Sequence, residues 1–187
     1  MNFEQGKKVL DELRLDCAIK QKKGLHFILA SVVLWSAVFG VHVSNLDALT
    51  KNFYTFCITA ILVPIAFLIS KIIKVDFQNK ENPLTNLGIL FSVNQFLYLI
   101  IAMWVYQAVP DKMLMVIAMI FGAHLMPFGW LYQSKSYMVL SGIVTVIALF
   151  IGCSYDSYIL AAVMIVIEII FCISLVIENK KLSANHI

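Results

Sequence analysis

Charged side chains are scarce in this sequence. They make up 13% of its 187 residues, whereas an average soluble domain has about 25%. Hydrophobic residues make up 61%. A soluble domain keeps charged residues on its surface and cannot bury so large an apolar share. The composition therefore excludes an ordinary soluble domain and predicts a membrane protein.

Motifs that carry known chemistry are missing as well. The sequence has no HExxH metalloprotease motif, no GxSxG nucleophile motif, no Walker motif and no GxGxxG. Its four cysteines show no CxxC or other metal-ligand spacing. Cys57 and Cys153 fall in the same half of the predicted membrane region and could meet, but packing as free thiols is the favoured interpretation. We therefore predict no catalytic residue, no cofactor and no metal site.

Long apolar runs are present instead. Six runs of about 17 to 23 residues are nearly free of charge, and about 20 helical residues cross a bilayer core of roughly 30 Å. Continuous apolar runs also exclude a β-barrel, whose strands alternate apolar and polar residues. The sequence thus predicts an all-α integral membrane bundle of six transmembrane helices. The predicted spans cover residues 25–43, 52–73, 86–108, 113–132, 136–152 and 157–177.

The distribution of charge predicts an orientation. If the N-terminus is cytosolic, twelve of the 14 Lys and Arg residues lie on the cytosolic side, and only Lys51 and Lys112 lie outside. This imbalance follows the positive-inside rule and indicates a cell-membrane protein with both termini in the cytoplasm. The transmembrane domain, residues 24–178, then carries a cytosolic tail at 179–187.

Residues 1–23 form the predicted cytosolic segment before the first span. Leu10, Leu13 and Cys17 share one side of a short amphipathic helix, which suits the surface of the lipid bilayer. The segment holds six basic and four acidic residues, so its charges nearly balance. We therefore predict no nucleic-acid partner.

Polar side chains inside the spans form the candidate site. Glu168 is the one charged residue in the middle of a span, where a charge costs about 2.5–3.5 kcal/mol on insertion scales. Residue counts from the span ends place Glu168 and His124 within about one turn of the midplane. Asn94 and Gln95 lie slightly to the cytosolic side, and Tyr98 shares their helix face. We predict that these residues form a mid-membrane polar site.

Two prolines predict helix kinks. Pro127 lacks the amide that would bond to the carbonyl of Ala123, so the fourth span should bend and leave an acceptor near His124. Pro64 frees the carbonyl of Ala60 in the second span in the same way. Kinked or broken helices are where transporters place ligand sites.

The role of the polar site stays open between two interpretations. In the first, its side chains are structural hydrogen-bond partners that join helices. In the second, Glu168 and His124 exchange protons or bind a cation during transport, which is the default hypothesis for ionisable groups in membranes. The second interpretation gives a small proton- or cation-responsive permease or channel-like protein of unknown substrate. Six short helices enclose little interior, so a homo-oligomer is expected.

An alternative function depends on contact with a partner membrane protein. Ala118, Gly122 and Gly129 form a stripe of small residues that lets another helix approach closely. A non-catalytic accessory, assembly or immunity-type protein would use such helix contacts.

The block from NPLTNLGILFSVNQ to GAHLMPFGWLYQSKSY, residues 82–137, resembles small, uncharacterised multi-spanning membrane proteins of bacteria. This resemblance implies a membrane fold and brings no activity or site residues with it.

Overall fold

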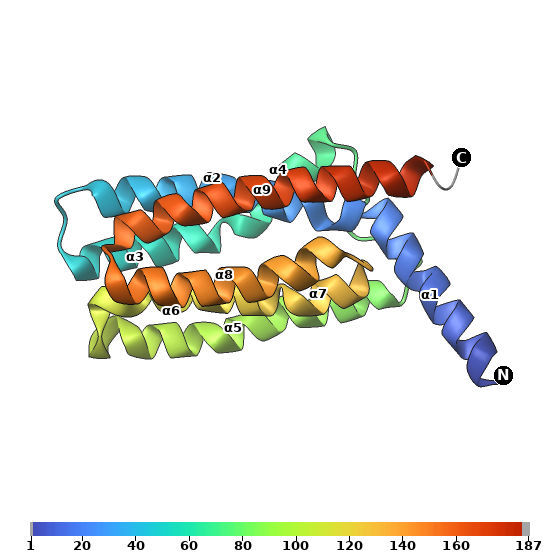
Figure 1. The fold of residues 1–187 in the computed structure, drawn as a ribbon, viewed down its shortest axis with the longest axis horizontal. Helices are drawn as coiled ribbons and strands as arrows, with labels where there is room; N and C mark the ends of the chain where they lie inside the picture. The colour runs from blue at the N-terminus through green and yellow to red at the C-terminus, as the bar shows by residue number, and fades with distance from the viewer. Residues whose placement is uncertain (1, 185–187) are drawn as a thin grey trace.

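The structure is a computed structural model that describes residues 2–184. The described part of the chain is helical and contains no strand (Figure 1). Six of its helical segments are long and apolar enough to cross a membrane. The predicted fold class, an all-helical bundle with six such segments, is therefore confirmed.

Four of the six segments are single helices and two are broken. The single helices are α2 (Leu25–Val43), α5 (Leu84–Ala108), α8 (Lys135–Ser154) and α9 (Ser157–Ala184). The second segment consists of α3 (Ala48–Ala60) and α4 (Leu62–Ile72), and the fourth consists of α6 (Met113–His124) and α7 (Met126–Leu131). Helix α1 (Phe3–Lys20) precedes the bundle, and the short 3₁₀ turns η1 (Lys22–Gly24) and η2 (Pro110–Lys112) complete the described elements.

Each break lies next to a proline. One helix ends at Ala60 and the next begins at Leu62, two residues before Pro64. The other pair divides at Leu125, two residues before Pro127. Proline is tolerated in the first turn of a helix, where amide groups need no partner within the helix, and disrupts a helix interior. The chain therefore restarts a helix so that each proline falls in its first turn.

Helix α9 extends beyond its predicted span. It continues from Ile177 to Ala184, through residues that were predicted to form a tail. The sequence ENKKLSA contains mostly residues that favour helices and no Pro or Gly to end one. Apolarity predicts how far a membrane span extends, whereas a helix continues wherever the backbone preference allows it.

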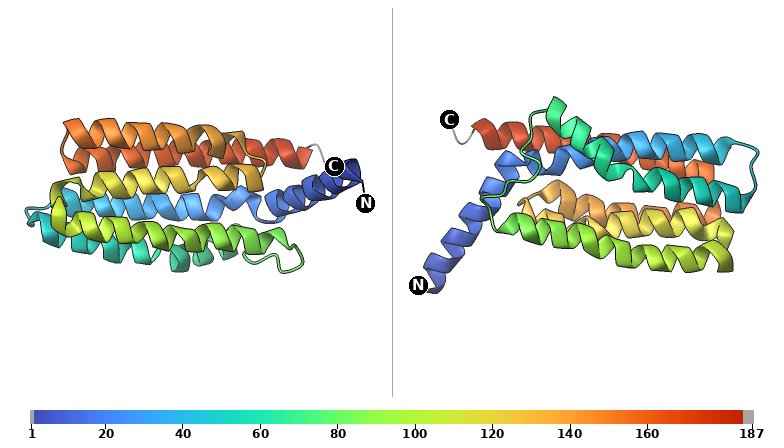
Figure 2. Two further views of the ribbon diagram at one scale, coloured as in Figure 1. Left: turned by 90° about the horizontal axis from the view of Figure 1, so that it is seen from below. Right: turned by 180° about the vertical axis from the view of Figure 1, so that it is seen from behind.

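The helices form two layers. Helices α2, α3, α4 and α9 make one layer, and α5, α6, α7 and α8 make the other (Figure 1). The most extensive pairings are α2 with α9 and α6 with α8. Helix α5 packs mainly on α6 and lies at the edge of the bundle. Figure 2 shows the same arrangement from two other sides.

Helix α1 and the end of α9 lie at the same end of the bundle, where α1 leaves at an oblique angle (Figure 1). We call this the α1 end. Gly24 makes the turn between α1 and α2 with a φ of 69°, and a Cβ there would lie 2.9 Å from the Tyr137 hydroxyl. Glycine alone fits both the backbone angle and the close approach. Twelve of the 14 Lys and Arg residues lie at the α1 end, and Lys51 and Lys112 lie at the opposite end.

Candidate functional site

Glu168 lies in the seam between α9 and α2. Its side chain is fully buried, with 0% exposed, and Oε2 is hydrogen-bonded to the hydroxyl of Ser31 from α2. Within the described chain, Oε1 has no hydrogen-bond partner. The neighbouring buried residues are apolar, among them Met164 and Phe171 on the same helix. One polar pair thus lies inside an otherwise apolar helix contact.

Ser31 has a second acceptor within reach. Its Oγ lies 2.8 Å from the carbonyl oxygen of Ile28, one turn earlier in α2. A hydroxyl has a single proton and donates one such bond at a time. If Glu168 is protonated, its hydroxyl donates to Ser31 while Ser31 donates to Ile28, and both bonds form together. If Glu168 is ionised, the Ser31 proton goes either to the carboxylate or to the carbonyl.

His124 ends α6 and is half-buried. Its Nδ1 lies 2.7 Å from the carbonyl oxygen of Phe121. In a regular helix that oxygen would accept from the amide of Leu125, but this amide donates to Gly122 at 3.2 Å instead. The tighter turn before Pro127 therefore leaves the Phe121 carbonyl free to form a hydrogen bond with the His124 imidazole. The predicted free acceptor was that of Ala123, so the imidazole uses a different carbonyl next to the same kink.

Among the hydrogen bonds of the described residues, none joins His124 to Glu168. Glu168 is bonded to Ser31, and His124 to its own helix. The rings of Phe121 and Phe128 lie 5.6 and 6.2 Å from the imidazole. The structure thus holds the two ionisable groups through separate partners.

The three predicted site residues of α5, Asn94, Gln95 and Tyr98, lie in the other layer. Asn94 is exposed, and its Nδ2 donates to the hydroxyl of Tyr98 at 2.8 Å. Phe91 of α5 packs against Phe128 of α7, with 5.8 Å between ring centroids. Counting four residues along each antiparallel helix from this contact puts Gln95 at the level of His124. The predicted polar site is therefore divided into Glu168 with Ser31, and a second group along the α5 and α6 layer.

His26 lies at the start of α2 and is not among the residues of the predicted polar site. The structure buries it, with 1% exposed. Its ring packs on Phe27 and Phe77, at centroid distances of 4.5 and 5.3 Å. Neither ring nitrogen has a partner among the described residues. The packing of Phe77, from the connection after α4, could not be read from the sequence.

Glu178 joins three parts of the chain at the α1 end. It accepts from Lys23 Nζ at 2.8 Å, from Ser134 Oγ at 2.7 Å, and from both the amide and the hydroxyl of Ser136 at 2.9 and 2.7 Å. The Lys23 side chain is 7% exposed and that of Glu178 is 20% exposed. The sequence placed Glu178 at the end of the transmembrane domain with no role. Its partners are far apart in sequence, so no spacing signal could reveal them.

Asp16 joins α1 to the connection between α4 and α5 through hydrogen bonds. Its Oδ2 accepts from Asn79 and Asn82 at 3.0 and 2.8 Å, and Lys20 lies 3.0 Å from Oδ1. Burial alone would raise the pKa of Asp16, but the hydrogen bonds from Asn79, Asn82 and Lys20 outweigh it. The pKa of this carboxyl therefore lies below its ordinary value of 3.8.

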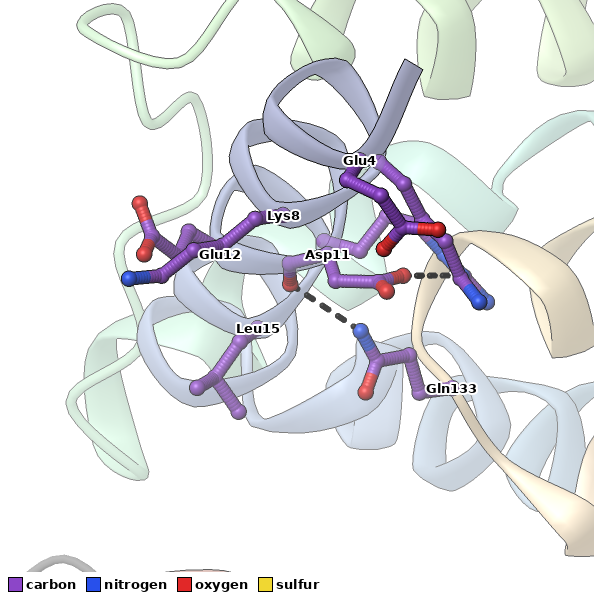
Figure 3. Close-up of a pocket in the computed structure, with 8 residues that line it drawn as sticks. Glu4, Lys8, Asp11, Glu12, Leu15 and Gln133 are labelled. Carbon is purple, nitrogen blue, oxygen red and sulfur yellow. Dashed lines mark hydrogen bonds and ion pairs between the residues drawn. The ribbon is translucent and has the colours of Figure 1, made fainter. Parts of the chain in front are cut away.

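A shallow pocket of about 710 Å³ follows the exposed sides of α1. Figure 3 shows residues that line it, among them Gln133, which donates to the backbone oxygen of Asp11. The Asp11 carboxylate accepts from Arg14 at 2.9 Å. Arg14 also stacks over the Trp130 ring at 4.5 Å and donates to the Trp130 carbonyl. These contacts position α1 against the bundle and leave its remaining charges on the surface.

A second pocket, of about 920 Å³, opens at the opposite end of the bundle. Its two lysines cap backbone carbonyls: Lys51 donates to His42 at 3.2 Å and Lys112 to Gly152 at 2.7 Å. Neither Glu168 nor His124 lines this pocket or the one along α1. In the described part of the chain, no three His, Cys, Asp or Glu residues gather closely enough to hold a metal ion.

The stripe of small residues is used inside the chain. Ala118 is fully buried. A Cβ on Gly122 would lie 2.7 Å from the Thr145 hydroxyl of α8, and one on Gly129 would lie 2.7 Å from Met138 of α8. The stripe therefore lets α8 approach α6 and α7, and it is not available to a partner protein.

A family model described as "Family of unknown function (DUF7010)" matches residues 10–178. No curated protein and no solved structure matches the chain. Since the family model covers most of the sequence, the chain belongs to the DUF7010 family.

Proposed function

We propose that this member of the DUF7010 family is a small permease or channel-like membrane protein in which Glu168 is the proton- or cation-responsive group. The α1 end faces the cytoplasm in this proposal, because it carries most of the Lys and Arg residues. His124 is a second polar group on the other layer and has no bond to Glu168.

The observation that carries the proposal is the burial of Glu168 with one carboxyl oxygen that has no partner among residues 2–184. A carboxyl group at this depth is costly, and it persists in membrane proteins mostly where it serves transport or joins helices. A purely structural role would be fulfilled best if both oxygens were paired, because an unpaired buried polar atom costs about 1–3 kcal/mol. Oε1 is the atom on which a proton or a cation would bind.

The Ser31 hydroxyl gives this group two states. A protonated Glu168 donates to Ser31, and Ser31 then donates to the Ile28 carbonyl at 2.8 Å. Loss of the proton removes one of these bonds and places a negative charge in the α2 and α9 seam. Because α2 and α9 form one of the two most extensive helix contacts, a change there alters how these two helices pack within their layer.

A flux assay tests the proposal. The purified chain is placed in liposomes that contain a pH-sensitive dye, and a potassium gradient with valinomycin sets an inside-negative potential. Wild-type protein should acidify the lumen faster than protein-free liposomes, and Glu168→Gln should abolish the difference, because Gln keeps the shape of Glu168 but cannot ionise.

The exposed residue Glu81 supplies the control, since its side chain is 90% exposed. Glu81→Gln should conduct like the wild type. The same vesicles with sodium or potassium gradients test cation movement. The proposal fails if wild-type vesicles move none of these ions, or if Glu168→Gln conducts as well as the wild type.

The accessory function is supported by a different observation. Helix α5 leaves most of its side chains exposed, including polar ones at membrane depth. A protein that acts through helix contacts would use this face, since the small-residue stripe on α6 and α7 is already covered by α8.

A further inference from the structure

Helix α5 is the least covered of the six apolar segments. Only 11% of its most apolar stretch is buried, against 50% for the segment that contains α2. Its inner side, with Ala102 and Val105, packs against the bundle. The remaining sides would face lipid if the chain were alone.

One of these exposed sides carries a polar residue that lipid cannot satisfy. Asn94 is the eleventh residue of the 25-residue helix, so at 1.5 Å per residue it lies about 15 Å from the start, within the bilayer core. Its bond to Tyr98 uses one amide proton, and within the described chain the other proton and Oδ1 of Asn94 have no hydrogen-bond partner. Tyr98 is 37% exposed, and its hydroxyl also has a proton to donate.

The residues around Asn94 follow a heptad pattern. Leu90, Asn94, Leu97, Ile101 and Trp104 are spaced alternately by four and three residues and form one stripe, which we call the Asn94 stripe. Its four apolar members are 52–67% exposed. In heptad terms Asn94 and Ile101 occupy a positions, and Leu90, Leu97 and Trp104 occupy d positions. Isoleucine at a with leucine at d favours two parallel helices, and a single Asn at an a position fixes register and oligomeric state.

We propose that the Asn94 stripe is the interface of a homodimer, in which α5 of one copy packs along α5 of a second copy. Two copies inserted in the same direction are related by a two-fold axis along the membrane normal, so each residue meets its own counterpart at the same depth. An amide side chain both donates and accepts, and Asn94 therefore satisfies its free groups with Asn94 of the other copy. A second copy is the partner that necessarily carries a matching polar group at this depth.

The neighbouring exposed stripe is a built-in comparison. Val93, Phe96, Ile100 and Met103 have the same spacing and are 52–65% exposed. Each lies on the same helix, one residue before a member of the Asn94 stripe, and none has a polar group. Lipid tails satisfy this second stripe fully, so it has no need of a partner helix.

Cysteine cross-linking in membranes tests the interface. The exposed Cys57 and Cys153 are first replaced by Ser. The buried Cys17 and Cys172 are kept. One cysteine is then added at Leu97 or Ile101, with Phe96 or Ile100 as matched controls, and the membranes are oxidised. The Asn94 stripe variants should form disulfide-linked dimers, and the control variants should not, because a disulfide needs Cβ atoms about 3.5–4.5 Å apart.

The dissociation constant of the dimer in detergent gives a second, independent readout. Asn94→Val in the otherwise unchanged chain should weaken dimerisation in detergent about threefold to tenfold, as expected for loss of hydrogen bonds between membrane helices. Ser92→Val is the control, because the exposed Ser92 hydroxyl is already bonded to the Gly88 carbonyl of its own helix at 3.1 Å. Analytical ultracentrifugation measures both.

Three results would overturn the inference: a wild-type chain that stays monomeric, cross-links that are stronger at Phe96 and Ile100, or an Asn94→Val chain that dimerises like the wild type. None of these results depends on ion flux. The dimer inference can therefore be refuted while the transport proposal stands, and the transport proposal can be refuted while the dimer inference stands.

Discussion

The hydroxyl of Ser31 is bonded to the carboxyl of Glu168 across the contact between α2 and α9. This is the one hydrogen bond of the Glu168 side chain in the described chain, since Oε1 has no partner. The relationship couples a residue near the start of the chain to one near its end. The contribution of this bond to stability can therefore be tested by replacing Ser31 alone and then Ser31 and Glu168 together.

Ser31→Ala should destabilise the protein, because it leaves both oxygens of Glu168 buried without a partner. We expect a loss of about 0.6–2 kcal/mol in the free energy of unfolding, the range between an average membrane hydrogen bond and an unpaired buried polar group. Thermal unfolding in detergent, followed by circular dichroism, measures it. The double variant Ser31→Ala, Glu168→Leu should recover stability, because it removes both polar groups together. A double variant no more stable than Ser31→Ala would show that the bond is not the source of the effect.

Glu178 is expected to stabilise the α1 end of the bundle. Glu178→Ala removes the acceptor for Lys23, Ser134 and Ser136 at once and leaves the largely buried Lys23 ammonium without its carboxylate. Because Glu178 is partly exposed, we expect about 2 kcal/mol of lost stability, below the 3–5 kcal/mol of a fully buried pair. Glu81→Ala serves as the control, with its distant contact of 3.6 Å to Lys20 and an expected change near zero. Equal melting temperatures for the two variants would contradict the assignment.

The sequence predicted an all-helical chain with six segments long and apolar enough to cross a membrane, because the length of an apolar run and the thickness of a bilayer are both set locally. It also placed Pro64 and Pro127 next to the points where the helices break, since a missing amide acts within its own helix. Partners across the bundle could not be predicted in this way. Depth along each helix was available for Glu168 and His124, but not the direction in which each faces.

The small-residue stripe illustrates the same limit. Ala118 and Gly122 were correctly read as a surface for close helix approach, but the sequence could not say whether the approaching helix belonged to this chain. The structure places α8 there. The heptad pattern on α5 was also present in the sequence, but only the exposure of its members separates it from the inner side that packs on the bundle.

Gly122 provides a direct test of the α6 and α8 contact. A Cβ at this position would lie 2.8 Å from a methyl group of Val144 and 2.9 Å from the backbone nitrogen of Thr145. Backbone cannot move aside cheaply, so Gly122→Ala should cost about 1–3 kcal/mol of stability. Gly142→Ala is the matched control on α8, because a Cβ at that position would meet nothing within 4 Å. There the change should be neutral or stabilising by up to about 1 kcal/mol, since Ala favours a helix over Gly. If both variants have the same melting temperature, α6 and α8 are less tightly packed than the structure indicates.

Acid should loosen the attachment of α1. Burial raises the pKa of Asp16, but hydrogen bonds from Asn79, Asn82 and Lys20 outweigh burial, so the pKa is lowered in the folded protein. A group with a lowered pKa contributes stability above its unfolded value, here about 3.8, and that contribution is lost as the pH falls through the folded pKa. Hydrogen exchange of α1 and residues 75–83, corrected for intrinsic rates, should therefore be constant near neutral pH and rise below about pH 4. Asp16→Asn removes the titrating group, so its exchange should already be raised at pH 7 and should not respond further to acid. If Asp16→Asn responds to acid as the wild type does, another carboxyl group controls the attachment, and the three donors around Asp16 would then be a consequence of α1 packing rather than its cause.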